Sequence, residues 1–128
     1  MPERKPVSPA GAGPNAALSP AMIVGDLLFV SRHVAVDTSG DVVGEGDAEA
    51  QTRQVMANIR AVIDAAGGKM EDVAKITCFI TDIASYPAYS KVRSETWPSS
   101  PPASSTVVVA GLVRPEFMVE VEAIVRLA

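Results

Sequence analysis

The sequence predicts an α+β fold in which a mostly antiparallel sheet carries two helices on one face. Three observations support this class. Apolar residues alternate along Phe117–Leu127 with the period of two that a half-buried strand shows. They recur at helical spacing between Asp47 and Ala66. The expected elements follow one another as strand, strand, a short optional strand, helix, strand, helix, strand and strand, an order typical of α+β domains.

The first expected strands are Met22–Val24 and Leu27–His33. The Gly-Asp pair between them is typical of a tight hairpin turn. Asp37–Gly40 gives a second turn signal, because Asp, Ser and Gly favour turn conformations. A short strand around Val42 and Val43 is expected to follow.

The first expected helix runs from Asp47, a residue type that caps helix N-termini, to Ala66. Glycines 67 and 68 then end this helix, because glycine readily adopts the left-handed conformation that follows many helices. The apolar residues that share one face of the helix are Val55, Ile59, Val62, Ile63 and Ala66.

A strand rich in β-branched residues is predicted over Val73–Thr81. The second helix is expected to begin after Ser85, its N-cap, and to end before Pro98. The segment Trp97–Ser105 should then be extended, because its consecutive prolines exclude helix.

Two apolar strands, Pro102–Leu112 and Phe117–Leu127, complete the predicted sheet. The turn residues between them predict a hairpin, and their nearly continuous apolar character predicts burial on both sides. In the second strand, Glu120 and Glu122 share one face, roughly 6.5–7 Å apart. That face is either an ordinary solvated strand face or a cleft in which the two carboxylates perturb each other's pKa.

The composition and net charge of the chain argue against several classes of function. The chain has 128 residues, 48% of them hydrophobic, so we expect one globular domain over residues 1–128, with residues 1–16 as a flexible tail. A net charge of −4 without a basic stripe argues against nucleic acid as a partner. Neither a signal peptide nor a membrane span is expected. The single cysteine, Cys78, indicates a reducing cytoplasm, and Cys78 and His33 alone cannot build a familiar zinc site.

The predicted arrangement implies self-association. A sheet with both helices on one face leaves its other face bare, and a large bare face with apolar residues is typical of an oligomer interface. Glu120 and Glu122 would lie on that face.

Five segments carry a resemblance to a known family. They are GDLLFVS (25–31), AQTRQVMANIRAVIDAAGG (50–68), VAKITCFITDI (73–83), PPASSTVVVAGL (101–112) and VEVEAI (119–124). In their order and spacing, the chain resembles the RidA/YjgF-type reactive-intermediate deaminases over residues 17–127.

The resemblance implies a chorismate-mutase-like fold and a homotrimer, in which three sheets form an inner barrel and small-molecule substrates bind at the subunit interfaces. It also implies hydrolysis of enamine and imine intermediates, such as 2-aminoacrylate and 2-iminopropanoate, to oxo acids and ammonia. Neither a metal nor an organic cofactor is needed for this reaction in the family.

The family's functional positions fall on five residues of this sequence. Glu120 corresponds to the acidic residue that positions the hydrolytic water, and Thr106 corresponds to a small polar pocket residue. Ser104 stands where the family has an arginine that grips the substrate carboxylate. Arg32 replaces a glycine whose backbone lines the pocket, and Leu18 replaces a tyrosine.

These departures leave three hypotheses open. The chain is an imine hydrolase whose missing cation is replaced by Arg32, unless Arg32 is simply a surface residue at a strand end. Alternatively, Ser104 and Thr106 bind a neutral group of another substrate, unless they only begin a strand. The third hypothesis is a non-catalytic small-molecule-binding or regulatory trimer. His33 is expected to be a polar surface or interface residue, and Cys78 a buried apolar one.

Overall fold

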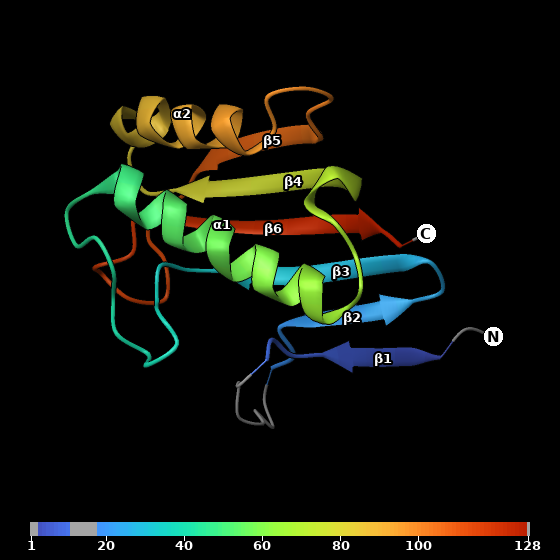
Figure 1. The fold of residues 1–128 in the computed structure, drawn as a ribbon. Helices are drawn as coiled ribbons and strands as arrows, with labels where there is room; N and C mark the ends of the chain where they lie inside the picture. Colours follow the sequence, from blue (N-terminus) through green and yellow to red (C-terminus); the bar gives the residue numbers. More distant parts are fainter. Residues whose placement is uncertain (1–2, 11–17, 128) are drawn as a thin grey trace.

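The computed structural model describes residues 3–10 and 18–127, and Figure 1 shows a sheet with the helices packed on one side of it. Within these residues the sheet has six strands in the order β1-β2-β3-β6-β4-β5. The α+β class and the mostly antiparallel sheet are therefore confirmed. The strands are β1 (Arg4–Val7), β2 (Ala21–Val24), β3 (Leu27–His33), β4 (Val73–Ile80), β5 (Ala103–Val108) and β6 (Val119–Arg126).

The helices form close to where the sequence places them. Helix α1 spans Ala48–Ala65, and the Asp47 carboxylate accepts a hydrogen bond from the backbone N–H of Ala50 at 3.0 Å, as expected of an N-cap. Helix α2 spans Tyr86–Thr96 and has Ser85 at its N-cap position. The short 3₁₀ turn η2 (Ile83–Ser85) precedes α2, and η1 (Met70–Asp72) precedes β4.

The predicted hairpin between the last two strands is wrong. Strand β6 lies in the middle of the sheet, antiparallel to both β3 and β4. Strand β5 instead pairs in parallel with β4 at the edge of the sheet, because α2 carries the chain back as a crossover. The expected burial of β5 on both sides is also wrong for a single chain, since Val107 and Val108 are exposed.

Two further expectations need correction. Part of the expected flexible tail is ordered: Arg4–Val7 pairs with β2 as an edge strand, because Val7 is buried in the core. Tail positions 1–2 and 11–16 lie outside the described residues. The expected strand at Val42 and Val43 is only an isolated bridge between Val36 and Val42.

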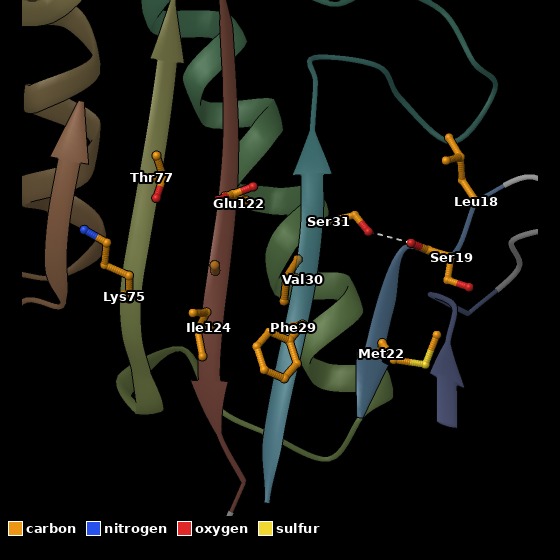
Figure 2. Close-up of a pocket in the computed structure, with 11 residues that line it drawn as sticks. Leu18, Ser19, Met22, Phe29, Val30, Ser31, Lys75, Thr77, Glu122 and Ile124 are labelled. Carbon is orange, nitrogen blue, oxygen red and sulfur yellow. Dashed lines mark hydrogen bonds between the residues drawn. The ribbon is translucent and has the colours of Figure 1, made fainter. Parts of the chain in front are cut away.

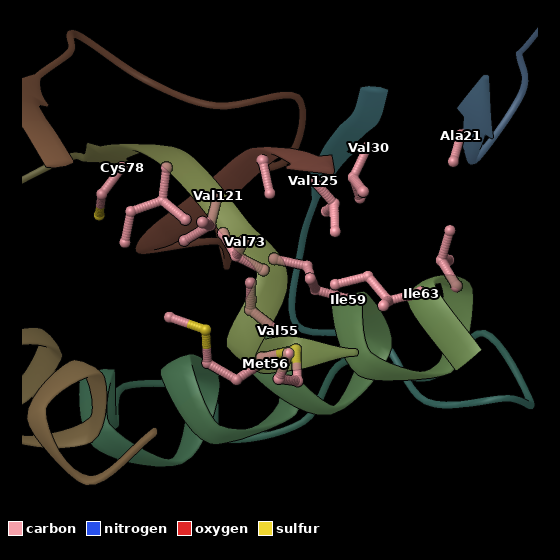
Figure 3. Close-up of a cluster of buried hydrophobic side chains, with 14 of the residues drawn as sticks. Ala21, Val30, Val55, Met56, Ile59, Ile63, Val73, Cys78, Val121 and Val125 are labelled. Carbon is pink, nitrogen blue, oxygen red and sulfur yellow. The ribbon is translucent and has the colours of Figure 1, made fainter. Parts of the chain in front are cut away.

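The hydrophobic core lies between the sheet and the helices. Figure 3 shows Val55, Ile59 and Ile63 of α1 facing the sheet, where Val121 and Val125 of β6 are fully buried. The predicted alternation of β6 is confirmed, because Val119, Val121, Ala123 and Val125 are all buried on this side. The core therefore occupies one face of the sheet only.

The other face is open in the single chain. Leu27 and Phe29 of β3 and Val107 of β5 are 37%, 41% and 43% exposed. Exposed apolar side chains on one sheet face are typical of an association surface. No helix within residues 3–10 and 18–127 is long and apolar enough to cross a membrane.

Candidate functional site

The open face of the sheet is hollowed by a cavity of about 510 Å³. Figure 2 shows side chains from β2, β3, β4 and β6 around it, with Leu18 at its rim and Glu122 on its floor. Leu18 is 72% exposed there. The residues that line it are Leu18, Ser19, Met22, Phe29, Val30, Ser31, Lys75, Thr77, Glu122, Ala123 and Ile124.

Arg32 turns toward Glu120 because strand β3 is irregular. Leu28 and Val30 point into the core, so strict alternation would bury Arg32 beneath the helices. A register shift between Val30 and His33 redirects the chain, as a β-bulge does. The Arg32 Nη1 atom consequently lies 3.7 Å from Glu120 Oε2, and the guanidinium carbon lies 5.7 Å from the centre of the Phe79 ring.

Glu120 is the more buried member of this ion pair. Its side chain is 10% exposed, whereas that of Arg32 is 58% exposed. Burial raises the pKa of the Glu120 carboxyl, the Arg32 charge opposes this increase, and the Glu122 carboxylate adds to it. A carboxylate with a raised pKa is a stronger base than an exposed one, so Glu120 is suited to accepting a proton from water.

Ser104 and Thr106 lie on the opposite side of the sheet from Glu120. In the parallel pairing with β4, Ser104 is beside Ile76 and Thr106 is beside Cys78, and both of these partners point into the core. The intervening Ser105 faces the open side, where its hydroxyl oxygen accepts a hydrogen bond from Lys75 Nζ at 2.7 Å. A single chain therefore does not bring all five predicted site residues together.

A second hollow, of about 360 Å³, lies between β5 and α2. It is lined by Ile83, Tyr86, Arg93, Ser104, Thr106 and Val108. Arg93 was missed in the sequence, although a signal was present: Tyr86, Tyr89 and Arg93 recur at three- and four-residue intervals and so share a helix face. We call this second hollow the α2 groove.

The remaining candidate residues have structural roles. Cys78 is fully buried as predicted, and burial raises the pKa of its thiol to about 12, so the thiolate is not available near neutral pH. His33 Nε2 lies 3.3 Å from the carbonyl oxygen of Pro20, and burial lowers the pKa of this imidazole. Among the described residues, no group of three His, Cys, Asp or Glu side chains is placed to hold a metal ion.

A mostly antiparallel sheet with both helices on one face is the architecture of an α+β protein. A family model described as Endoribonuclease L-PSP matches residues 10–127, and the chain belongs to this family. The resemblance to RidA/YjgF-type proteins is confirmed by solved structures of that group.

Three solved structures illustrate the similarity. A Yersinia pestis protein of the conserved Rid protein family is 30% identical, with a TM-score of 0.91 over 98% of this chain and 100% of its own. A yeast protein is also 30% identical, with a TM-score of 0.90 over the same shares. A member of the highly conserved YjgF family from Mycobacterium tuberculosis is 25% identical, with a TM-score of 0.82 over 98% and 100% of the two chains.

Proposed function

We propose that this protein hydrolyses small enamines and imines to oxo compounds and ammonia, with a substrate preference altered from that of its relatives. The observation that carries the proposal is the buried Glu120 carboxylate, which faces Arg32 on the open side of the sheet. Glu120 is the general base in this proposal, and no cofactor takes part. The single cysteine of the sequence supports a reducing, cytoplasmic compartment.

The proposal includes a homotrimer whose three sheets face inward as a barrel. The exposed apolar residues of the open face, Leu27, Phe29 and Val107, support it because such side chains are stabilised when a second copy covers them. Closed rotational assembly is also the usual solution for identical subunits. The cavity on the open face is then enclosed by neighbouring subunits.

The division of the site across the sheet supports an inter-subunit pocket. Glu120 and Arg32 lie on the open face, whereas Ser104 and Thr106 lie by the α2 groove. In the proposal, each pocket takes Glu120, Arg32 and the apolar Leu18 from one subunit, and Ser104 and Thr106 from the next. Strand β5 is an edge strand, so its neighbour in the trimer can approach it directly.

The chemical step follows from these groups. The Glu120 carboxylate accepts a proton from a water molecule as the water oxygen forms a bond to the imine carbon. The C=N electron pair moves to nitrogen, which takes up a proton from solvent water; one proton returns to the solvent when the hydroxyl is deprotonated in the last step. Glu120 then returns its proton to the amino group of the tetrahedral intermediate, the C–N bond breaks, ammonia leaves, and the hydroxyl loses its proton as the C=O bond forms. One imine and one water thus give one oxo compound and one ammonia.

Arg32 influences the pKa of Glu120 in this step. Its positive charge opposes the effect of burial on the pKa of Glu120 and so favours the carboxylate form that acts as the base. Its guanidinium is exposed enough to keep donors available for a substrate beside Glu120.

The test is ammonia release from 2-iminopropanoate, generated in situ from alanine by an amino-acid oxidase. We expect Glu120→Gln to reduce the rate roughly 10²–10⁴-fold, the range for loss of a general base. Asp64→Asn is the control, because this exposed carboxylate lies on α1, on the other side of the sheet, and the variant should retain the wild-type rate within about threefold. Equal rates for the wild type and Glu120→Gln would refute the proposal.

One observation favours a second function, a non-catalytic small-molecule-binding or regulatory trimer. Ser104 lacks the charged, two-pronged grip that an arginine gives a carboxylate. In that case, a neutral small molecule such as pyruvamide should bind and raise the melting temperature while imine hydrolysis stays at the uncatalysed rate. Turnover by the wild-type protein would exclude this alternative.

RNA cleavage, which the description of the family model names, is less compatible with this chain. The net charge is −4, and several cations are already paired, including Arg53 with Glu95 at 2.8 Å and Arg114 with Glu116 at 2.7 Å. Phosphate backbones are bound chiefly by available Lys and Arg side chains. An RNA-degradation assay on the same preparation should therefore show no activity.

A further inference from the structure

The α2 groove contains a cation with no matching anion. Arg93 lines the groove together with Tyr86 of α2 and Ser104 of β5, and it is half-buried. Among the described residues, no carboxylate oxygen lies within 4.0 Å of its guanidinium. By contrast, Arg53 pairs with Glu49 at 3.1 Å and with Glu95 at 2.8 Å. A half-buried positive charge without a counter-charge is stabilised by a negatively charged ligand.

Neutral partners hold the Arg93 guanidinium in place. Nη1 donates to the Tyr86 hydroxyl at 3.2 Å, and Nη2 donates to the Ser90 hydroxyl at 3.0 Å. The guanidinium carbon also lies 5.7 Å and 5.4 Å from the ring centres of Tyr86 and Tyr89. Arg93 is therefore oriented before any ligand arrives, and it keeps further N–H donors because a guanidinium has five.

Hydroxyl groups complete the polar lining of the groove. Ser104 and Thr106 are two positions apart on β5, so they share the face of the strand that lines the groove. The buried Tyr89 hydroxyl has no hydrogen bond of good geometry to any described residue. Burial raises the pKa of this phenol, and the neighbouring Ser104 hydroxyl opposes the increase.

We infer that Arg93, Ser104 and Thr106 form a carboxylate-binding site for small 2-oxo and 2-imino acids, in which helix α2 supplies the cation that strand β5 lacks. This inference rests on the proposed function, because it names the group that binds the substrate carboxylate. Arg93 then binds the substrate carboxylate, and Arg32 favours the carboxylate form of Glu120.

Calorimetric titration with pyruvate tests this assignment without turnover. We expect Arg93→Gln to weaken pyruvate binding about tenfold to a hundredfold, the effect of losing one charge-assisted contact. Arg93→Lys should fall between the wild type and Arg93→Gln, because a lysine keeps the charge but loses the planar fork. Arg60→Gln, which removes an arginine from α1 away from the groove, is the matched control and should bind as the wild type does.

Two further measurements separate binding from folding. Circular dichroism and the melting temperature of each variant report whether α2 stays folded. Pyruvamide, a neutral probe of the same size, should bind equally to the wild type and to Arg93→Gln, because only the carboxylate interacts with the missing charge. A general disruption of the groove would weaken both probes equally and would overturn the inference.

The outcomes distinguish this inference from the proposed function. Unchanged pyruvate binding by a folded Arg93→Gln variant would overturn the site, even if imine hydrolysis by the wild type is robust. Arginine-dependent pyruvate binding by a protein that releases no ammonia would confirm the site and refute the hydrolase.

Discussion

The two faces of this sheet are built from the same strands but differ in what covers them. On one face, Val121 and Val125 of β6 are fully buried beneath α1. On the other, Phe29 and Val107 remain exposed, and Glu120 and Arg32 form an ion pair beside them. The first face contains the hydrophobic core that stabilises the folded chain. In the proposed trimer, the second face carries the groups for association and chemistry, so its stability should depend on other subunits.

The largest effect on the free energy of unfolding is expected from a substitution that shortens a core side chain on the covered face. Ile59 is fully buried, so Ile59→Ala removes packing that no rearrangement of a second subunit replaces. We expect a loss of about 2–5 kcal/mol in the free energy of unfolding. Urea denaturation measures it, and a loss below about 1 kcal/mol would show that the core is not the main source of stability.

A substitution of an apolar residue on the open face should weaken the association of subunits instead. Phe29→Ser removes an aromatic ring that is 41% exposed in the single chain. If neighbouring subunits bury this ring, the variant loses about 0.6–1.2 kcal/mol of association free energy per subunit, the share of a full Phe burial that the exposed 41% represents. Sedimentation should show smaller species, while circular dichroism shows the native secondary structure. An unchanged oligomer would place the interface elsewhere.

A smaller, pH-dependent effect is expected at Glu120. Its pKa is raised in the folded chain, so the protonated form is favoured by folding, and this stabilisation is lost as the pH rises through the folded-state pKa. Glu120→Gln should therefore be more stable than the wild type at neutral pH by less than about 1 kcal/mol, because solvent and Arg32 screen the charge. The difference should vanish below the ordinary pKa of 4.5. A less stable Gln variant at neutral pH would show that the Arg32 pair outweighs desolvation.

The covered face was predictable from local sequence signals. The Asp47 cap, the helical spacing around Ile59 and the alternation of Val119–Val125 each depend on residues close together in the chain. Strand order was not predictable in this way. Turn residues before Phe117 predicted a hairpin, but pairing of β5 with β4 depends on the α2 crossover and on the burial of β6 between β3 and β4.

The candidate site was predictable only in part. The alternation of β6 correctly placed Glu120 away from the core, and the family resemblance singled out Ser104 and Thr106. The bulge that turns Arg32 to Glu120 has no clear signal in the sequence. Arg93 was missed because its role depends on the packing of α2 beside β5, which brings together residues eleven positions apart.

The central claim is that the site is shared, with Glu120 from one subunit and Arg93 from the next. The most direct test mixes Glu120→Gln and Arg93→Gln subunits, each impaired alone, by unfolding and refolding them together in equal amounts. Random assembly should restore both wild-type halves in about a quarter of the sites, so ammonia release should return to roughly that fraction of the wild-type rate. If the mixture is no more active than the two separate variants, the shared site is contradicted.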